Sequence, residues 1–383
     1  LWTCSGYASY PALTIISNRM GAMLPAEYPD KHQVANIKDV ARAAGVGIAT
    51  VSRALNGQEG VSAQTRKRIE ETAATLGYQP NRHARFLKLN SNRSIAVVIK
   101  GLENPLFARI LDQLERAIRS HDYQVNIVSV PHWSDELRDA IQTVDEDSAL
   151  GVIFLGAHFQ HRVDDLEKLS VPFVVSTVSM KDSAHRERYA SVAIDDYGEA
   201  GRVVDYLYQL GHRQIGIIGS DSLDNSVGSL RLAGYFDALR KHGIEPHPQW
   251  VRSFDNSEDS PYSFENGYRM TRDLLQECPD VTAIFAIADV LAIGAMQAAR
   301  DMNLCIPRDI SIVGFDGIPL GSYVYPALTT VNQPADEIAE ITCDLLFSQL
   351  NGEQPRHIIV PGHLLPKGTT AAPAQLSDIR ENR

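Results

Sequence analysis

Residues 36–56 read Asn36-Ile-Lys-Asp-Val-Ala-Arg-Ala-Ala-Gly-Val-Gly-Ile-Ala-Thr-Val-Ser-Arg-Ala-Leu-Asn56. Asn36 is a good N-cap for a helix, and Gly45 supplies a turn that ends it. A second short helix is predicted from about Ile48 to Leu55. The first helix places its apolar residues on one face: Ile37, Val40, Ala41 and Ala44. The second should bury Val51 and Leu55 and leave four side chains exposed: Ile48, Ala49, Ser52 and Arg53.

A third helix must complete this unit, because two short helices joined by a tight turn cannot bury enough apolar surface alone. Residues 62–77 supply it, with Ser62 as the N-cap and Gly77 as the stop. Its apolar residues are Ile69, Ala73 and Leu76. Residues 36–79 are therefore predicted to form a helix-turn-helix domain.

The charge of the chain is divided unevenly between its two ends. Residues 36–94 contain ten Lys and Arg against four Asp and Glu, which gives +6, while residues 1–35 balance to zero. Since the whole chain carries −11, residues 95–383 carry −11 − 6 = −17. Basic helices are often only solvated faces, but here the charge coincides with the helix-turn-helix pattern. This coincidence favours a DNA-binding head on an acidic body.

The chain resembles the lactose-repressor (LacI/GalR) family of bacterial transcription regulators from these residues to about residue 370. The matching segments are Ile37-Lys-Asp-Val-Ala41, Thr50-Val-Ser-Arg53, Leu55-Asn56, Val61-Ser62, Thr65-Arg66, Leu76-Gly-Tyr-Gln-Pro-Asn81 and Ala84-Arg85. Several linked motifs in the right order are more specific than a single helix-turn-helix match. The resemblance implies a regulator that binds operator DNA as a homodimer, with a tetramer left open.

The resemblance also assigns DNA contacts to this chain. Ile48 and Ala49 would meet base edges in the major groove, and Arg53 would donate a bidentate bond to guanine. The remaining DNA-binding residues would mainly hold phosphates and set the register: Thr50, Ser52, Asn56, Arg66, Asn81 and Arg85. Gly47 departs from the family, which usually places Ser at this N-cap. Gly costs only a few tenths of a kcal/mol there.

Residues 80–93 resemble the hinge helix and linker of the family. The helical part, Pro80 to Asn90, is too short to be stable alone in water. Leu87 matches the leucine that wedges into a central base step of the minor groove. Phe86 departs from the family, which usually has Ser there. The alternative is an ordinary linker with incidental basic residues.

Residues 94–370 read as alternating apolar strands and amphipathic helices, which predicts parallel α/β sheets covered on both faces. This length favours two lobes over a single sheet. The predicted strands are Ile95–Ile99, Val125–Val130, Gly151–Leu155, Pro172–Val175, Ile215–Ile218, Ala283–Ala286 and Ile310–Val313. The fold class is therefore an all-α helix-turn-helix domain plus a two-lobed parallel α/β body, similar to periplasmic binding proteins. Residues 1–35 are expected to be a disordered extension and residues 371–383 a C-terminal tail.

Ligands of such sheets bind beyond the carboxyl ends of the strands, and the residues there suit a small polyhydroxylated molecule. The candidate ligand-binding residues are Phe107, Asp196, Arg231, Asp289 and Asp316. The resemblance supports Phe107, Arg231 and Asp316 as ligand contacts, whereas Asp196 and Asp289 could instead cap the helices that follow them. Ala288 departs from the family, which often has Asn before this Asp, and this leaves the identity of the ligand open.

Other functional classes lack their motifs. The chain has no nucleophile elbow, no phosphate-binding glycine loop and no metal-spaced His or Cys cluster, so we expect no enzyme, no cofactor and no metal site. A periplasmic sugar-binding protein would need a signal peptide, which Leu1–Met23 does not resemble, and no apolar run could span a membrane. We expect a cytoplasmic repressor released by a sugar or sugar phosphate. The alternative is corepression by a purine.

Overall fold

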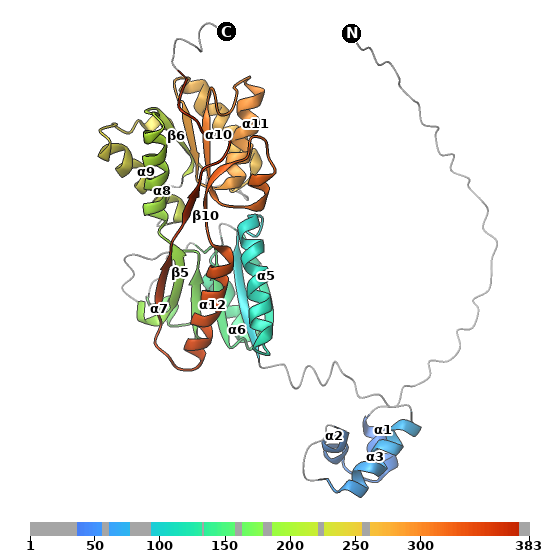
Figure 1. Ribbon diagram of the computed structural model, residues 1–383. Helices are drawn as coiled ribbons and strands as arrows, with labels where there is room; N and C mark the ends of the chain where they lie inside the picture. The colour runs from blue at the N-terminus through green and yellow to red at the C-terminus, as the bar shows by residue number, and fades with distance from the viewer. Residues whose placement is uncertain are drawn as a thin grey trace, which may run out of the picture. The chain divides into compact units, whose positions relative to one another are not determined.

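The computed structural model describes residues 37–55, 61–76, 93–131, 134–157, 163–178, 186–220, 226–254 and 261–374 (Figure 1). Several predictions lie outside these residues: the N-terminal extension, the hinge helix with Asn81, Arg85 and Leu87, Asn56, and the end of the C-terminal tail. The predicted helix ends Asn36 and Gly77 also lie outside the described residues. The same holds for the side chains of Ile37, Ala49, Ser52 and Leu55, so the predicted burial of Ile37 and Leu55 stays a prediction. The described residues form a helical unit and a body, and each is treated by itself.

The helical unit consists of α1 (Ile37–Ala44), α2 (Ile48–Leu55) and α3 (Ala63–Thr75), which confirms the helix-turn-helix prediction. Gly45 adopts the left-handed φ of +64° that the turn requires. Ser62 caps α3, because its hydroxyl accepts a hydrogen bond from the Thr65 amide at 3.3 Å. The buried core is Val40, Ala41, Ala44, Val51, Ala54, Ile69 and Ala73. Leu76 does not join it, contrary to the prediction, because this residue follows the last turn of α3 and its side chain is 39% exposed.

The first lobe of the body is a six-stranded parallel sheet in the order β11-β5-β4-β3-β1-β2. Its strands are β1 (Ser94–Lys100), β2 (Gln124–Val130), β3 (Gly151–Leu155), β4 (Phe173–Ser176), β5 (Ala190–Ile194) and β11 (His357–Val360). Its helices are α5 (Pro105–Ser120), α6 (Glu136–Asp147), α7 (Val163–Leu166) and α12 (Ala335–Leu350), with a 3-10 turn at Arg186–Arg188. The continuous apolar runs of β1 and β3 reflect burial on both faces.

The second lobe has the sheet order β12-β10-β9-β8-β6-β7, in which β12 alone runs antiparallel to its neighbour. Its strands are β6 (Ile215–Ser220), β7 (Val251–Ser253), β8 (Ala283–Ala286), β9 (Ser311–Asp316), β10 (Thr329–Asn332) and β12 (His363–Leu365). Its helices are α8 (Asp196–Gln209), α9 (Val227–Lys241), α10 (Phe264–Glu277) and α11 (Asp289–Asp301), with 3-10 turns at Pro248–Trp250 and Pro319–Ser322. Two parallel α/β lobes are thus confirmed.

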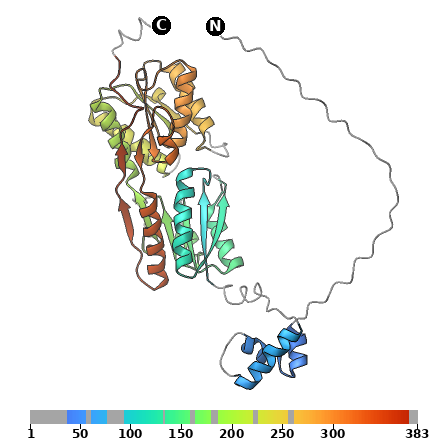
Figure 2. The ribbon, with the colours of Figure 1, turned by 45° about the vertical axis from the view of Figure 1, so that its right-hand side comes forward.

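The chain passes between the lobes three times in the described residues, after β5, after β10 and after β11. As a result α12 and β11 belong to the first lobe although the second lobe precedes them in sequence, as the red segments of Figure 2 show. The strands β1 and β9 end at Lys100 and Asp316 on the sides of the lobes that face each other. This arrangement places the strand-end residues of both lobes around one pocket.

Candidate functional site

A pocket lies between the two lobes and contains about 580 Å³ of empty space, including the part open to solvent. Residues from both lobes line it: Lys100, Gly101, Asn104, Leu106, Phe107, Gly156, Ala157, Thr177, Val178, Val227, Arg231, Tyr262, Asp316 and Gln333. Three of the five predicted ligand-binding residues, Phe107, Arg231 and Asp316, are therefore brought together here. Asp196 and Asp289 do not line the pocket.

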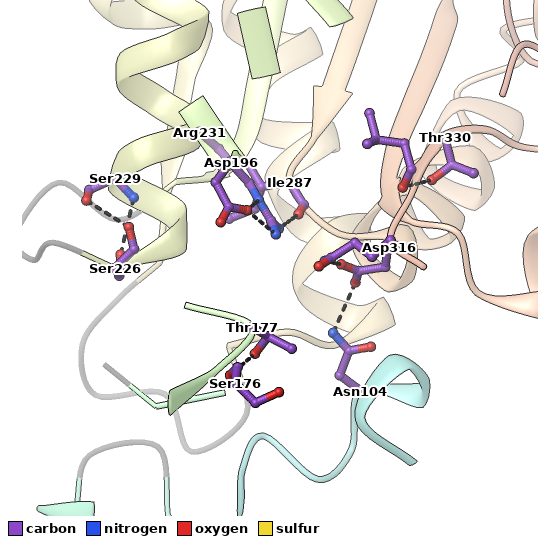
Figure 3. Close-up of polar contacts among 12 residues, drawn as sticks. Asn104, Ser176, Thr177, Asp196, Ser226, Ser229, Arg231, Ile287, Asp316 and Thr330 are labelled. Carbon is purple, nitrogen blue, oxygen red and sulfur yellow. Dashed lines mark hydrogen bonds and ion pairs between the residues drawn. The ribbon is translucent and has the colours of Figure 1, made fainter. Parts of the chain in front are cut away.

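Arg231, in the N-terminal half of α9, is held by contacts with Asp196, Ile287 and Phe315, and Figure 3 shows the first two. Its Nε and Nη2 atoms lie 2.9 and 2.8 Å from Asp196 Oδ1, and its Nη1 donates to the Ile287 carbonyl at 2.5 Å. Its guanidinium carbon stacks 3.7 Å from the centre of the Phe315 ring. Burial raises the pKa of the Asp196 carboxyl, and the charge of Arg231 opposes that rise. Asp196 therefore orients Arg231 and is not itself presented to the pocket.

Asp316 joins the two lobes through its carboxylate. Its Oδ2 accepts a hydrogen bond from Asn104 Nδ2 of the first lobe at 3.0 Å (Figure 3). Its Oδ1 accepts one from Gln333 Nε2 at 2.8 Å. Asn104 is itself fixed, because its Oδ1 caps α5 by accepting from the Leu106 amide at 3.0 Å. Burial raises the pKa of Asp316 to about 6, although Arg231 and the two amide donors favour the ionised form. The carboxylate is thus both a lobe-to-lobe contact and a pocket wall.

Phe107 packs its ring against a glycine that has no room for a side chain. Gly156 has φ +72°, and a Cβ added there would lie 2.5 Å from the Lys100 carbonyl oxygen and 2.6 Å from the ring of Phe107. Gly156 follows β3, so the close approach is set by the end of a buried strand. This contact holds an aromatic face against the pocket, as a binding site for a sugar or base ring would need.

Asp289 has a structural environment away from the pocket lining. The side chain is fully buried and accepts from the Thr330 hydroxyl at 2.6 Å and from the Ile318 amide at 2.7 Å. Burial raises the pKa of Asp289 to about 8, and the nearby charge of Asp316 adds to the rise. The carboxyl therefore links α11 to β10 and to Ile318, which follows β9, and it does not line the pocket.

Lys100 is a pocket residue that the sequence analysis missed. It is only 4% exposed, and its Nζ donates to Glu136 Oε2 at 2.6 Å and to the Ser134 carbonyl at 2.9 Å. A lone lysine at the end of an otherwise apolar strand was the available signal. Four further polar pocket residues also went unpredicted as ligand contacts: Asn104, Thr177, Tyr262 and Gln333.

The predicted DNA-reading surface of α2 is open in the helical unit. Ile48 is 46% exposed, Arg53 is exposed and Thr50 is partly exposed, while Val51 on the opposite face is fully buried. Arg66 of α3 has a second role, because its Nη1 donates to the Ala54 carbonyl near the end of α2 at 3.3 Å. It therefore supports α2 in addition to any contact with phosphate.

Comparison with known proteins matches residues 36–81 to the bacterial regulatory proteins of the lacI family and residues 204–370 to the periplasmic binding protein-like domain. The transcriptional regulator MalR of Clostridium butyricum is 34% identical over 335 residues, which are 87% of this chain and 98% of MalR. This chain belongs to the lacI family. The transcriptional repressor CytR of Escherichia coli K12 is also 34% identical, over 83% of this lacI-family chain and 91% of its own length.

Solved structures of the family align with most of this chain. The lac repressor dimer bound to operator and the anti-inducer ONPF aligns with TM-score 0.69 and 27% identity, over 89% of this chain and 100% of its own. The regulator CelR in complex with cellobiose aligns with TM-score 0.64 and 26% identity, over 88% and 99%. This lacI-family protein is thus a helix-turn-helix DNA-binding transcriptional regulator with a small-molecule effector domain. None of its described helices is long and apolar enough to cross a membrane.

Proposed function

We propose that this regulator represses transcription by binding an operator as a homodimer and leaves the operator when a polyhydroxylated effector enters the pocket between its lobes. The observation that carries the proposal is the meeting of Arg231 and Asp316 of the second lobe with Asn104 and Phe107 of the first in one pocket. A ligand bound there touches both lobes at once, so it can favour one arrangement of the lobes over another.

The hydrogen-bonding capacity of the pocket suits several hydroxyl groups. A guanidinium has five N–H groups, and contacts with Asp196 and Ile287 engage the Nε, Nη1 and Nη2 atoms of Arg231 once each. One N–H on each terminal nitrogen is thus left for a ligand. Each oxygen of Asp316 accepts one amide bond and keeps a lone pair. The neighbouring donors and acceptors suit the hydroxyl groups of a sugar, and the flat face of Phe107 suits the apolar face of its ring.

The same carboxylate couples the ligand to the lobes. A ligand hydroxyl that donates to Asp316 competes with, or reinforces, the bond from Asn104 across the lobes. The equilibrium between lobe arrangements would then depend on occupancy of the pocket. By linkage, operator DNA must weaken effector binding by the same factor by which the effector weakens operator binding.

DNA recognition is proposed to follow the family pattern. Ile48, Ala49 and Arg53 read bases, and Leu87 wedges into the minor groove. Phosphates are held by Thr50, Ser52, Asn56, Arg66, Asn81 and Arg85. One short recognition helix offers too few base contacts for operator selectivity, so two copies are needed, as in the similar lac repressor dimer.

Size-exclusion chromatography with light scattering distinguishes this dimer from a monomer or a tetramer.

A gel-shift titration against the upstream region of the gene for this chain tests the proposal. Cellobiose and ribose are the first effectors to add, since a CelR–cellobiose complex and a ribose operon repressor are among the similar proteins. The expected result is a specific complex that an effector dissociates. A complex that a purine strengthens would instead show corepression. The absence of any specific complex would contradict the proposal.

A further inference from the structure

We infer that the effector of this pocket carries no negative charge and is an uncharged polyhydroxylated molecule, not its phosphorylated or carboxylated counterpart. The inference rests on the proposed function, because it describes the ligand of the same pocket. It comes from the charge balance of the described residues in and directly behind the pocket wall.

Both cations of the described pocket wall are already neutralised by buried carboxylates. Lys100 lies 2.6 Å from Glu136, with each side chain 4% exposed. Arg231 lies 2.8 Å from Asp196, with side chains 5% and 1% exposed. A phosphate that drew either cation away would leave a carboxylate buried without its partner, which is strongly destabilising. Neither cation is therefore available to compensate a second anion.

Asp316 adds a negative charge that no cation of the described residues pairs directly. Its two hydrogen-bond partners, Asn104 and Gln333, are neutral amides. The other charged or titratable groups that act on it are Arg231, which already pairs with Asp196, and the acidic Asp196 and Asp289. Burial raises the pKa of Asp316 to about 6, and the charge of Asp196 adds to this rise, while Arg231 and the two amides oppose it. Counting Lys100 and Arg231 against Glu136, Asp196 and Asp316 gives 2 − 3 = −1 when Asp316 is ionised.

A negative wall of this kind repels anions but serves hydroxyl groups well. A ligand O–H that donates to Asp316 stabilises the carboxylate where the amides leave lone pairs free. Arg231 keeps N–H donors for neutral oxygens, and Lys100 has a third N–H beyond its bonds to Glu136 and Ser134. An uncharged polyol can bond to Asp316, Arg231 and Lys100 without breaking the ion pair of either cation.

The test is isothermal titration of the full-length protein with matched pairs of probes: glucose and glucose 6-phosphate, ribose and ribose 5-phosphate, adenosine and AMP. For each pair that binds, we expect the neutral member to bind at least about tenfold more tightly, since one unscreened charge in a buried site is worth that much or more. Tighter binding of a phosphorylated member would overturn the inference. A neutral probe that binds without affecting operator affinity would contradict the proposed function and leave this inference intact.

Inorganic phosphate gives a second arm that needs no knowledge of the effector. We expect no saturable binding of phosphate to the wild-type protein, and saturable binding that is lost in Lys100→Gln would overturn the inference. In Asp316→Asn the preference for the neutral member of a pair should fall by about tenfold. Asp336→Asn is the matched control, because Asp336 pairs with Arg109 on the exposed surface and should leave the preference unchanged.

Discussion

The recognition helix α2 and the effector pocket use side chains in opposite ways. On α2 the predicted base-reading residues Ile48 and Arg53 are exposed, and the core is made by other positions of the helix, such as Val51 and Ala54. In the pocket, Arg231 and Asp316 are 4% and 2% exposed and already bonded to protein groups. On α2 the proposed DNA-binding residues thus lie outside the core, whereas in the pocket the residues proposed to bind the effector also make buried contacts within the protein.

This difference has an energetic consequence. An exposed residue that contacts only a binding partner can be substituted at little cost to stability, because the substitution leaves no buried polar group unsatisfied. A buried residue that presents part of itself to a ligand also satisfies the polar groups behind it. Its removal exposes those groups to an apolar environment without their partners. Variants should therefore separate the two sites by stability as well as by binding.

The largest effect is expected for Arg231→Ala. This variant leaves Asp196 and the Ile287 carbonyl buried without their donor, so unfolding should become easier by about 3–5 kcal/mol. Denaturant titration measures it, and Arg109→Ala, which breaks an exposed pair with Asp336, should cost less than about 1 kcal/mol. Adding Asp196→Asn to Arg231→Ala should restore part of the loss. If Arg231→Ala lost the effector response but kept its full stability, Arg231 would serve binding alone, as the exposed residues of α2 are expected to do.

The second effect is the pH dependence of stability that Asp316 contributes. Its pKa is raised from an ordinary value of 3.8 to about 6, so between these values the folded protein binds more protons than the unfolded chain. The free energy of unfolding should therefore fall as pH rises from 4 to 6, by up to about 3 kcal/mol from this group. Asn has the same shape as the Asp that already occupies the φ of 119° here, so Asp316→Asn should lack this component and keep the backbone conformation.

The comparison is made on the difference between the wild type and each variant, which removes the other titrating groups. Asp336 is the control of opposite sign, because the hydrogen bond from Arg109 lowers its pKa. Its stabilising contribution is present above the ordinary pKa and lost as pH falls, and solvent screening keeps it small. If the free energy of unfolding changed with pH in the same way in the wild type and in Asp316→Asn, the pKa of Asp316 would not be raised in the folded protein.

The third effect concerns Arg53→Ala on the recognition helix. Loss of the proposed bidentate bond to guanine should cost about 1–3 kcal/mol on the operator and little on random DNA, with no change in stability. Arg66→Ala is the contrasting variant, because Arg66 also bonds the Ala54 carbonyl at 3.3 Å and should lower the stability of the helical unit by about 1 kcal/mol. Fluorescence anisotropy on both DNAs measures the binding. Equal losses on both for Arg53→Ala would remove this residue from base readout.

The same contrast explains how far the sequence could predict the structure. Local patterns sufficed for α1 to α3 and for strands such as β1, β3 and β8, whose apolar runs carry their own signal. They did not predict β10, β11 and β12, which are short and lie where the chain crosses between lobes. Gln333 was missed for this reason, since it follows β10.

The pocket residues themselves were only partly predictable. Phe107, Arg231 and Asp316 were identified by the family resemblance, but spacing could not show that Asp196 serves Arg231 or that Asp289 bonds Thr330. Those partners are 35 and 41 residues apart in the chain. Lys100 and Glu136 are likewise separated by 36 residues, so the charge balance of the pocket emerges only from the folded lobes.

The smallest effect is expected at Gly47, on the exposed side of the comparison. Its carbonyl accepts the amides of Thr50 and Val51 at 2.9 and 3.1 Å, which identifies it as the N-cap of α2. A Cβ at Gly47 would meet nothing nearer than the Thr50 hydroxyl at 3.9 Å, so Gly47→Ser should add a capping bond without strain. Hydrogen exchange of the α2 amides should slow by an amount equal to a few tenths of a kcal/mol. Gly45→Ser is the matched control. Gly45 also has open space around it, but its φ is +64°, so the free energy of opening of α2 should fall by about 1 kcal/mol and its amides should exchange faster. Faster exchange in Gly47→Ser would mean that the serine side chain cannot cap α2. The N-cap position would then be constrained, and the exposed side of α2 could not be changed without a cost to folding.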